Sequence, residues 1–132
     1  MARSERNQPI DPSVLKTLHA LQREGRPDIL STLITLFLDN AAALLKDLEK
    51  AARNGDIESL HHASHALTSA SANVGASPLS ACCKDLEQLA RAGAVLDPVG
   101  RVEAIMAEYR RAEAALLAYL ARITGSTMGV SA

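Results

Sequence analysis

The sequence is poor in aromatic residues and in cysteine. Its 132 residues include one Phe, two Tyr and no Trp, and β-branched residues occur only in short patches. Ala and Leu dominate instead, which favours helices over strands. The two cysteines, Cys82 and Cys83, are neighbours in the chain, so they have a poor geometry for a disulfide and no metal-ligand spacing. We therefore expect an all-helical protein from a reducing, cytoplasmic setting.

A dominant charge and long apolar runs are also lacking. The 14 basic and 15 acidic residues give a formal net charge of −1, so there is no basic footprint for a nucleic acid. No run approaches the ~20 apolar residues of a spanning helix, and the first ten residues have no signal-peptide core. We expect no nucleic-acid partner and no membrane insertion of this domain. The length and the 48% hydrophobic content suit one domain that covers residues 1–132.

Apolar residues recur with helical spacing in five segments. An Asp or Ser before a Pro predicts three helix starts, at residues 11–12, 77–78 and 97–98, and Gly residues predict helix ends. The predicted helices cover about 12–25, 27–53, 56–74, 77–93 and 97–123, between a flexible leader (1–10) and a flexible tail (125–132). This pattern predicts an all-α fold: an antiparallel up-down four-helix bundle with an additional short N-terminal helix that covers one end.

Residues 60–76 place one histidine, His65, on the outer face of a predicted helix. On a helical wheel His65 lies about 160° from the centre of the apolar stripe. Ser69 lies equally far out, and His62 and Ala72 lie beside it. An exposed helix face is normally rich in Lys and Glu, so a histidine among small uncharged residues indicates a docking face for another protein.

A second predicted helix brings a carboxylate toward this histidine. Folding the chain back near residues 73–77 places residues 86–88 opposite position 65, which makes Glu87 a candidate neighbour of His65. Arg91 follows one turn later, as a candidate cation for what the imidazole binds or as an ordinary ion-pair partner of Glu87. A carboxylate bonded to Nδ1 would fix the tautomer and leave Nε2 as an outward nucleophile. The pattern therefore predicts a phosphorylatable histidine.

The segment HALTSASANVGA, followed by CCKDLEQLAR, resembles the histidine-containing phosphotransfer domain of multistep phosphorelays. The pattern of that family reads approximately H-x-L-K-G-x-x-x-x-x-G and then C-x-x-L-E, and the similarity covers most of the chain. It implies that His65 is the phosphoacceptor, that Glu87 orients its imidazole and that Gly75 ends the active helix. It also implies a four-helix bundle with an extra N-terminal helix.

Two positions depart from the family pattern. Thr68 stands where the family usually has a lysine that steadies the phosphoryl group, and Ser69 stands where it usually has a glycine. Phosphoryl transfer needs cations or hydrogen-bond donors for three charged oxygens. We expect this help from the hydroxyls of Thr68 and Ser69, from Arg91 or Lys84, or from the partner.

The resemblance implies a phosphocarrier and not an enzyme. Nε2 of His65 would relay a phosphoryl group between the aspartates of receiver domains, which belong to a hybrid sensor kinase or a response regulator. The chain would need no cofactor, because the Mg²⁺ belongs to the receiver. The surface around His65, with His62, Ala66, Ser69 and Ala72, would contact the partner. A cytoplasmic location follows, for a free protein or for the cytoplasmic C-terminal domain of a membrane-bound hybrid kinase.

Two other functions remain open at this point. The missing lysine at Thr68 leaves room for an adaptor or inhibitor bundle that binds a receiver without phosphotransfer. His61 and His65 have the i, i+4 spacing of a helical metal site, but the other helices offer no further ligand pair, so we expect no metal. His61 and His62 are then interpreted as surface residues that flank the docking face, and the two cysteines as small core residues.

Overall fold

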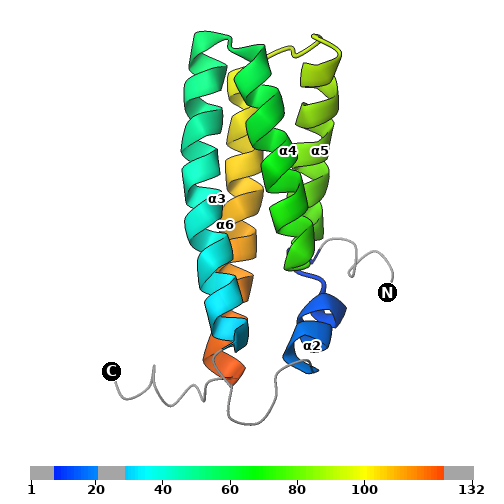
Figure 1. Ribbon diagram of the computed structural model, residues 1–132, viewed down its shortest axis with the longest axis vertical. Helices are drawn as coiled ribbons and strands as arrows, with labels where there is room; N and C mark the ends of the chain where they lie inside the picture. The colour runs from blue at the N-terminus through cyan, green and yellow to red at the C-terminus, as the bar shows by residue number, and fades with distance from the viewer. Residues whose placement is uncertain (1–7, 21–28, 124–132) are drawn as a thin grey trace.

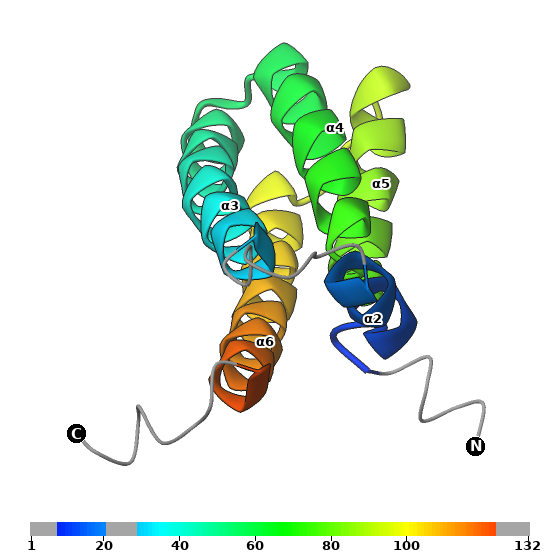
Figure 2. The same cartoon turned by 60° about the horizontal axis from the view of Figure 1, so that its bottom comes forward.

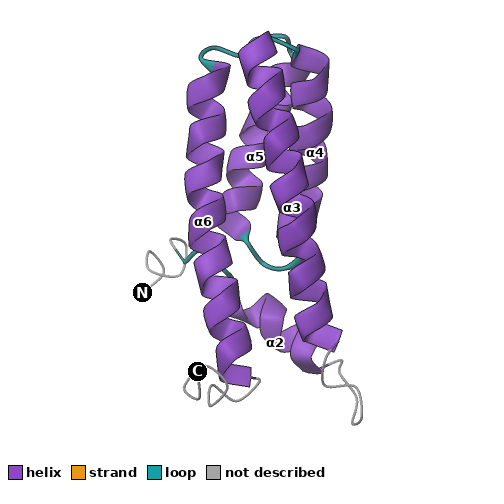
Figure 3. Cartoon of the chain, turned by 90° about the vertical axis from the view of Figure 1, so that its left-hand side faces the viewer, coloured by secondary structure: helices purple, strands orange, loops and turns teal. Residues whose placement is uncertain are grey.

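The computed structural model describes residues 8–20 and 29–123, and within these ranges the regular structure is entirely helical (Figure 3). The expectations for residues 1–7, for the end of the first helix near residue 25, for the helix start at residues 27–28 and for the tail lie outside the described residues. The described helices are α2 (Pro12–Ala20), α3 (Ile29–Asn54), α4 (Ile57–Asn73), α5 (Ser77–Arg91) and α6 (Pro98–Ile123).

The four long helices run alternately up and down (Figure 1). Each helix packs against the next along the chain, and α6 returns to pack against α3, so the bundle closes around one core. The short helix α2 lies at the end of the bundle where α4 turns into α5 (Figure 2). There the amide of Asp11 donates to the carbonyl of Gly75 at 2.7 Å. The predicted four-helix bundle with an additional N-terminal helix is confirmed.

The core is mainly aliphatic, and every described helix contributes to it. A side-chain hydrogen bond also joins α6 to α3: the hydroxyl of Tyr109 donates to the carbonyl of Leu38 at 3.3 Å. The side chain of Ile10 is buried and packs into the core. The predicted flexible leader therefore does not extend to residue 10. The largest fully buried side chains are those of Leu15, Leu30, Ile34, Leu48, Leu60, Leu67, Leu79, Leu86, Ile105 and Leu116.

The starts of α2, α4 and α6 follow the predicted signals, whereas the start of α5 does not. Asp56 caps α4 by accepting hydrogen bonds from the amide (3.1 Å) and the hydroxyl (2.6 Å) of Ser59. These bonds hold the pKa of Asp56 below its usual value. Asp97 accepts from the amide of Gly100 at 3.1 Å. The cap predicted at Ser77 is wrong, because Ser77 is already helical and Ala76 precedes the helix without a side-chain cap.

The apolar content of α3 is higher than expected. By length and composition alone this helix would be able to cross a membrane, since an 18-residue window has a mean hydropathy of 1.5. That result contradicts the expectation that no stretch comes close to a spanning helix. In the bundle its side chains at Leu30, Ile34, Phe37 and Ala41 are buried on one face, and 28% of the apolar window is buried.

Candidate functional site

His65 projects from the middle of α4, on the side opposite the buried residues of that helix. The buried residues of α4 are Leu60, Ala63, Ser64, Leu67 and Ser71, all on the face that the helical wheel predicts. The side chain of His65 is 64% exposed. The imidazole is therefore accessible to a partner on the outer surface of the bundle.

Glu87 of α5 holds the imidazole of His65 by one edge. Its Oε2 lies 2.7 Å from Nδ1 of His65, and the Glu87 side chain is only 9% exposed. An ionised carboxylate can only accept hydrogen bonds, so in the neutral ring this contact selects the tautomer with the proton on Nδ1 and the lone pair on Nε2. The hairpin of α4 and α5 brings these residues together across 22 positions of sequence. The sequence predicted this pairing.

Arg91 shares the same carboxylate oxygen. Its Nη2 lies 3.4 Å from Oε2 of Glu87, and its side chain is 69% exposed. The guanidinium thus stands one helical turn beyond Glu87, at the edge of the histidine site, with most of its donors in solvent. Arg91 is therefore an ion-pair partner of Glu87.

Thr68 is tied into the backbone of the helices. Its hydroxyl donates to the carbonyl of Ser64 at 2.7 Å, so in this conformation its proton is not available to a phosphoryl group. The carbonyl of Thr68 accepts in turn from the hydroxyl of Ser80 on α5 at 2.9 Å. Sequence reasoning missed Ser80, although its position seven residues before Glu87 puts both on the same face of α5.

His61 is half-buried and lies beside His65, which corrects its interpretation as a surface residue. The two rings are stacked, with centroids 6.2 Å apart and planes 17° apart. Nε2 of His61 is inaccessible to solvent and has no hydrogen-bond partner among the described residues. The reason is the lean of helical side chains toward the N-terminus, which lays His65 over the turn that carries His61.

The remaining predicted contact residues are distributed around His65. Ala66, Ser69 and Ala72 are exposed on α4, and Lys84 is exposed on α5 one turn before Glu87. The predicted core cysteines differ from each other. Cys83 is buried, and burial raises the pKa of its thiol to about 12, whereas Cys82 is only half-buried.

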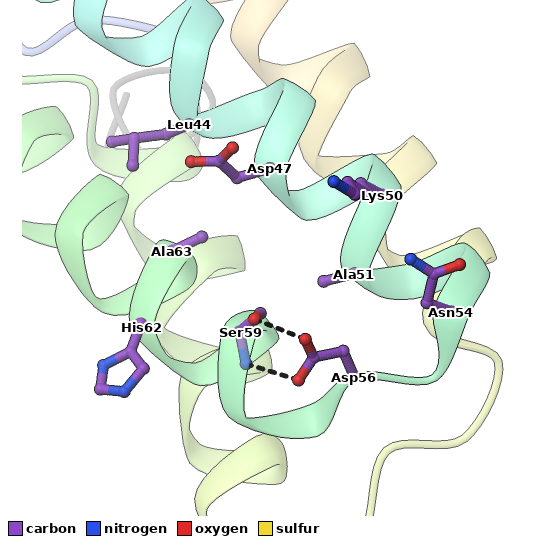
Figure 4. Close-up of a pocket in the computed structure, with 9 residues that line it drawn as sticks. All are labelled: Leu44, Asp47, Lys50, Ala51, Asn54, Asp56, Ser59, His62 and Ala63. Atoms are coloured by element: carbon purple, nitrogen blue, oxygen red, sulfur yellow. Dashed lines mark hydrogen bonds between the residues drawn. The ribbon is translucent and has the colours of Figure 1, made fainter.

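His65 itself lines neither of two hollows found between α3 and α4. A polar cleft of about 410 Å³ lies between the later half of α3 and the start of α4, and His62 stands at its rim (Figure 4). An apolar groove of about 810 Å³ lies between the first half of α3 and the end of α4, and its lining includes Leu18 of α2. Small-molecule sites are normally concave, whereas the exposed ring of His65 lies outside both of these hollows.

The charged groups do not assemble a metal centre in the described ranges. No group of three or more His, Cys, Asp or Glu side chains there is arranged to hold a metal ion. The pairing of His61 with His65 is a ring contact, and Glu87 contacts His65. The cleft near His62 is lined by Leu44, Asp47, Lys50, Ala51, Asn54, Asp56, Ser59, His62 and Ala63.

Comparison with known proteins points to one family. Residues 32–123 match the family model of the Hpt domain. Among solved structures, the chain is similar to histidine-containing phosphotransfer protein B from Pseudomonas aeruginosa PAO1, with 26% identity and a TM-score of 0.78 over 88% of this chain and 97% of that one. A comparison with curated protein sequences gave no match. The chain therefore belongs to the Hpt domain family and is a histidine phosphotransfer protein or domain of a phosphorelay.

Proposed function

We propose that His65 is the phosphoacceptor and that Nε2 carries the phosphoryl group. The observation that carries this proposal is the 2.7 Å contact between Nδ1 of His65 and the buried carboxylate of Glu87, on a ring that is otherwise exposed. The donor is the aspartyl phosphate of a receiver domain in a hybrid sensor kinase or a response regulator. The acceptor is the aspartate of another receiver domain.

The transfer consists of one displacement at phosphorus. The Nε2 lone pair forms a bond to phosphorus while the bond from phosphorus to the aspartyl oxygen breaks, and the carboxylate of the receiver leaves with the electron pair. The proton on Nδ1 stays in its hydrogen bond to Glu87, whose negative charge stabilises the positive charge that develops on the ring. The reverse displacement delivers the group to the next receiver.

The phosphoryl oxygens need donors or cations during transfer. Arg91 and Lys84 of α5 are the cations of this chain that we assign to the site, and Ser69 offers an exposed hydroxyl on α4. Thr68 assists only after its hydroxyl leaves the carbonyl of Ser64. The Mg²⁺ that neutralises the transferring group belongs to the receiver in this proposal, so the chain acts as a carrier and not as an enzyme.

The receiver docks over the phosphoacceptor on α4. Ala66, Ser69 and Ala72 leave room for a close approach, because they are small and uncharged. A separate apolar groove between α3 and α4 carries Leu33 and Leu36, which are 41% and 59% exposed. Exposed leucines beside a hollow are typical of a protein contact surface. His62 lines the cleft at the opposite end of the contact between α3 and α4. We place the chain in the cytoplasm, either as a free protein or as the C-terminal domain of a membrane-bound hybrid kinase.

The test mixes the purified chain with a phosphorylated receiver domain and measures acid-labile, base-stable phosphate on the chain. We expect label on the wild type and on the control His19→Gln, whose exposed histidine lies on α2. We expect no label on His65→Gln. An unlabelled wild type, or full labelling of His65→Gln, contradicts the proposal. Receiver binding that persists without any label identifies the adaptor function instead.

A further inference from the structure

We propose that His61 is a positioning residue for His65, and that its ring supports the face of the His65 imidazole so that Nε2 points outward. This inference rests on the proposed phosphoacceptor role of His65. The buried Nε2 of His61 makes no hydrogen bond with any described residue. The positioning role explains why a histidine occupies a half-buried position on α4.

A single hydrogen bond does not fix an imidazole. The contact with Glu87 holds Nδ1, which is next to the attachment point of the ring, whereas Nε2 lies on the far side and moves furthest when the side chain rotates about Cα–Cβ. A second ring that is nearly parallel restricts this rotation on one face. His61 provides such a ring, with planes 17° apart and centroids 6.2 Å apart.

The burial of His61 supports a specific role for its ring. An inaccessible ring nitrogen without a partner costs stability, because the nitrogen loses its hydrogen bond to water and gains none in the protein. An aliphatic side chain would fill the same space without this cost. What a histidine adds over an aliphatic residue is a flat face, and that face is turned to the proposed nucleophile.

The neighbouring histidine does not share this arrangement. His62 meets the ring of His61 edge-on, with planes 68° apart, and its own side chain is exposed. Its Nε2 lies 4.0 Å from Oε2 of Glu58, at the limit of an ion pair. Of the three histidines of α4, only His61 is stacked with His65 among the described rings.

The experiment measures phosphorylation of the whole chain by phosphoramidate, a small donor that needs no docking surface. Nε2 of His65 displaces ammonia as the P–N bond of the donor breaks. We expect His61→Ala to lower the rate about 3- to 10-fold. His61→Phe keeps a flat ring without nitrogen and stays within about twofold of the wild type. The histidine control His19→Ala keeps the wild-type rate.

A second measurement separates positioning from loss of fold. The ¹⁵N chemical shifts of the His65 ring report which nitrogen carries the proton. We expect them to move toward the average of the two tautomers in His61→Ala and to stay in place in His61→Phe. Should His61→Ala fail to fold, His61→Leu, which fills the space without a flat face, takes its place with the same expected loss. Circular dichroism establishes folding for each variant.

The outcomes distinguish this inference from the proposed function. If the wild type gains no label from either phosphoramidate or a receiver, the phosphoacceptor role fails. If the wild type is labelled and the variant that lacks a ring keeps both the rate and the His65 shifts, the positioning role of His61 fails alone. A loss in His61→Phe as large as that in His61→Ala also contradicts it, because a flat ring would then not be sufficient.

Discussion

Removing the carboxylate of Glu87, which holds the imidazole of His65, should lower the rate of phosphotransfer and leave the fold intact. In Glu87→Ala the His65 ring loses its only described hydrogen bond, at Nδ1, and the proton is then free to occupy either nitrogen. The fraction of rings with a free lone pair on Nε2 falls, and the positive charge of the transfer step loses its counterion. We expect slower phosphotransfer with the fold intact.

The magnitude follows from the exposure of the two partners. A hydrogen bond to a charged group contributes about 1.5–3 kcal/mol, and His65 is 64% exposed, so water screens part of this contribution. We take about 1–1.5 kcal/mol, which corresponds to about a 5- to 10-fold lower rate. Glu87→Gln keeps an amide oxygen that accepts from Nδ1 but has no charge, so we expect a loss of about 2- to 5-fold.

Replacing Glu87 with Gln should have little effect on the free energy of unfolding. Glu87 is a buried carboxylate, and burying its charge costs free energy that the two contacts offset only in part. His65 and Arg91 are both largely exposed, so neither becomes a buried unpaired group when Glu87 is removed. We expect the free energy of unfolding to change by less than about 1 kcal/mol in Glu87→Gln.

The assay follows the initial rate of transfer from a phosphorylated receiver, and urea denaturation measures the stability of the same samples. Wild-type rates in both variants would refute the idea that Glu87 orients the nucleophile. A large loss of stability in Glu87→Gln would refute the idea that Glu87 contributes little to the stability of the fold. Equal losses in the two variants would show that charge matters and hydrogen-bond geometry does not.

Four further predictions follow from other positions. Thr68→Lys supplies the cation that the family pattern has at this place, and we expect phosphohistidine to survive about 3- to 10-fold longer, as measured by loss of label, whereas the uncharged Thr68→Met should not lengthen its lifetime. Gly75→Ala introduces a Cβ at φ +78°, 2.9 Å from a side chain of α2, and should cost about 2–3 kcal/mol in urea denaturation; Gly93→Ala, at φ +67° with open space, should cost about 1 kcal/mol. Because the pKa of Asp56 is lower in the folded state, its cap stabilises the protein above its usual pKa of 3.8 and the effect is lost as the pH falls through the lowered value; Asp56→Ala should thus lower the melting temperature at pH 7 but not at pH 2. Cys83, with its pKa raised to about 12 by burial, should react with iodoacetamide at pH 8 only after unfolding, as measured by mass spectrometry.

The structure shows what Thr68 does at the position where the family pattern has a lysine. The side chain that replaces the usual lysine uses its hydroxyl within α4, and its carbonyl receives Ser80 from α5. The position therefore contributes to the junction of the two helices that carry His65 and Glu87. Under the proposed function, cationic help for the phosphoryl group then comes from α5 or from the partner.

The helices and the outward direction of His65 were predictable from the sequence alone. A helical period reports how each side chain is oriented about its own axis, and this is enough to put His65 outward and Leu60 and Leu67 inward. The pairing of His65 with Glu87 was also predictable, because a short turn between two helices fixes their register locally.

Which neighbours cover each side chain depends on how the helices pack against one another. The burial of His61, the bond from Ser80 to Thr68 and the packing of Ile10 all depend on which neighbouring element lies above a residue, and no period in the sequence encodes this. The same holds for the apolar groove, whose lining combines residues from α2, from α3 and from the end of α4. Residues on one helix report their own orientation, whereas enclosure is a property of several elements packed together.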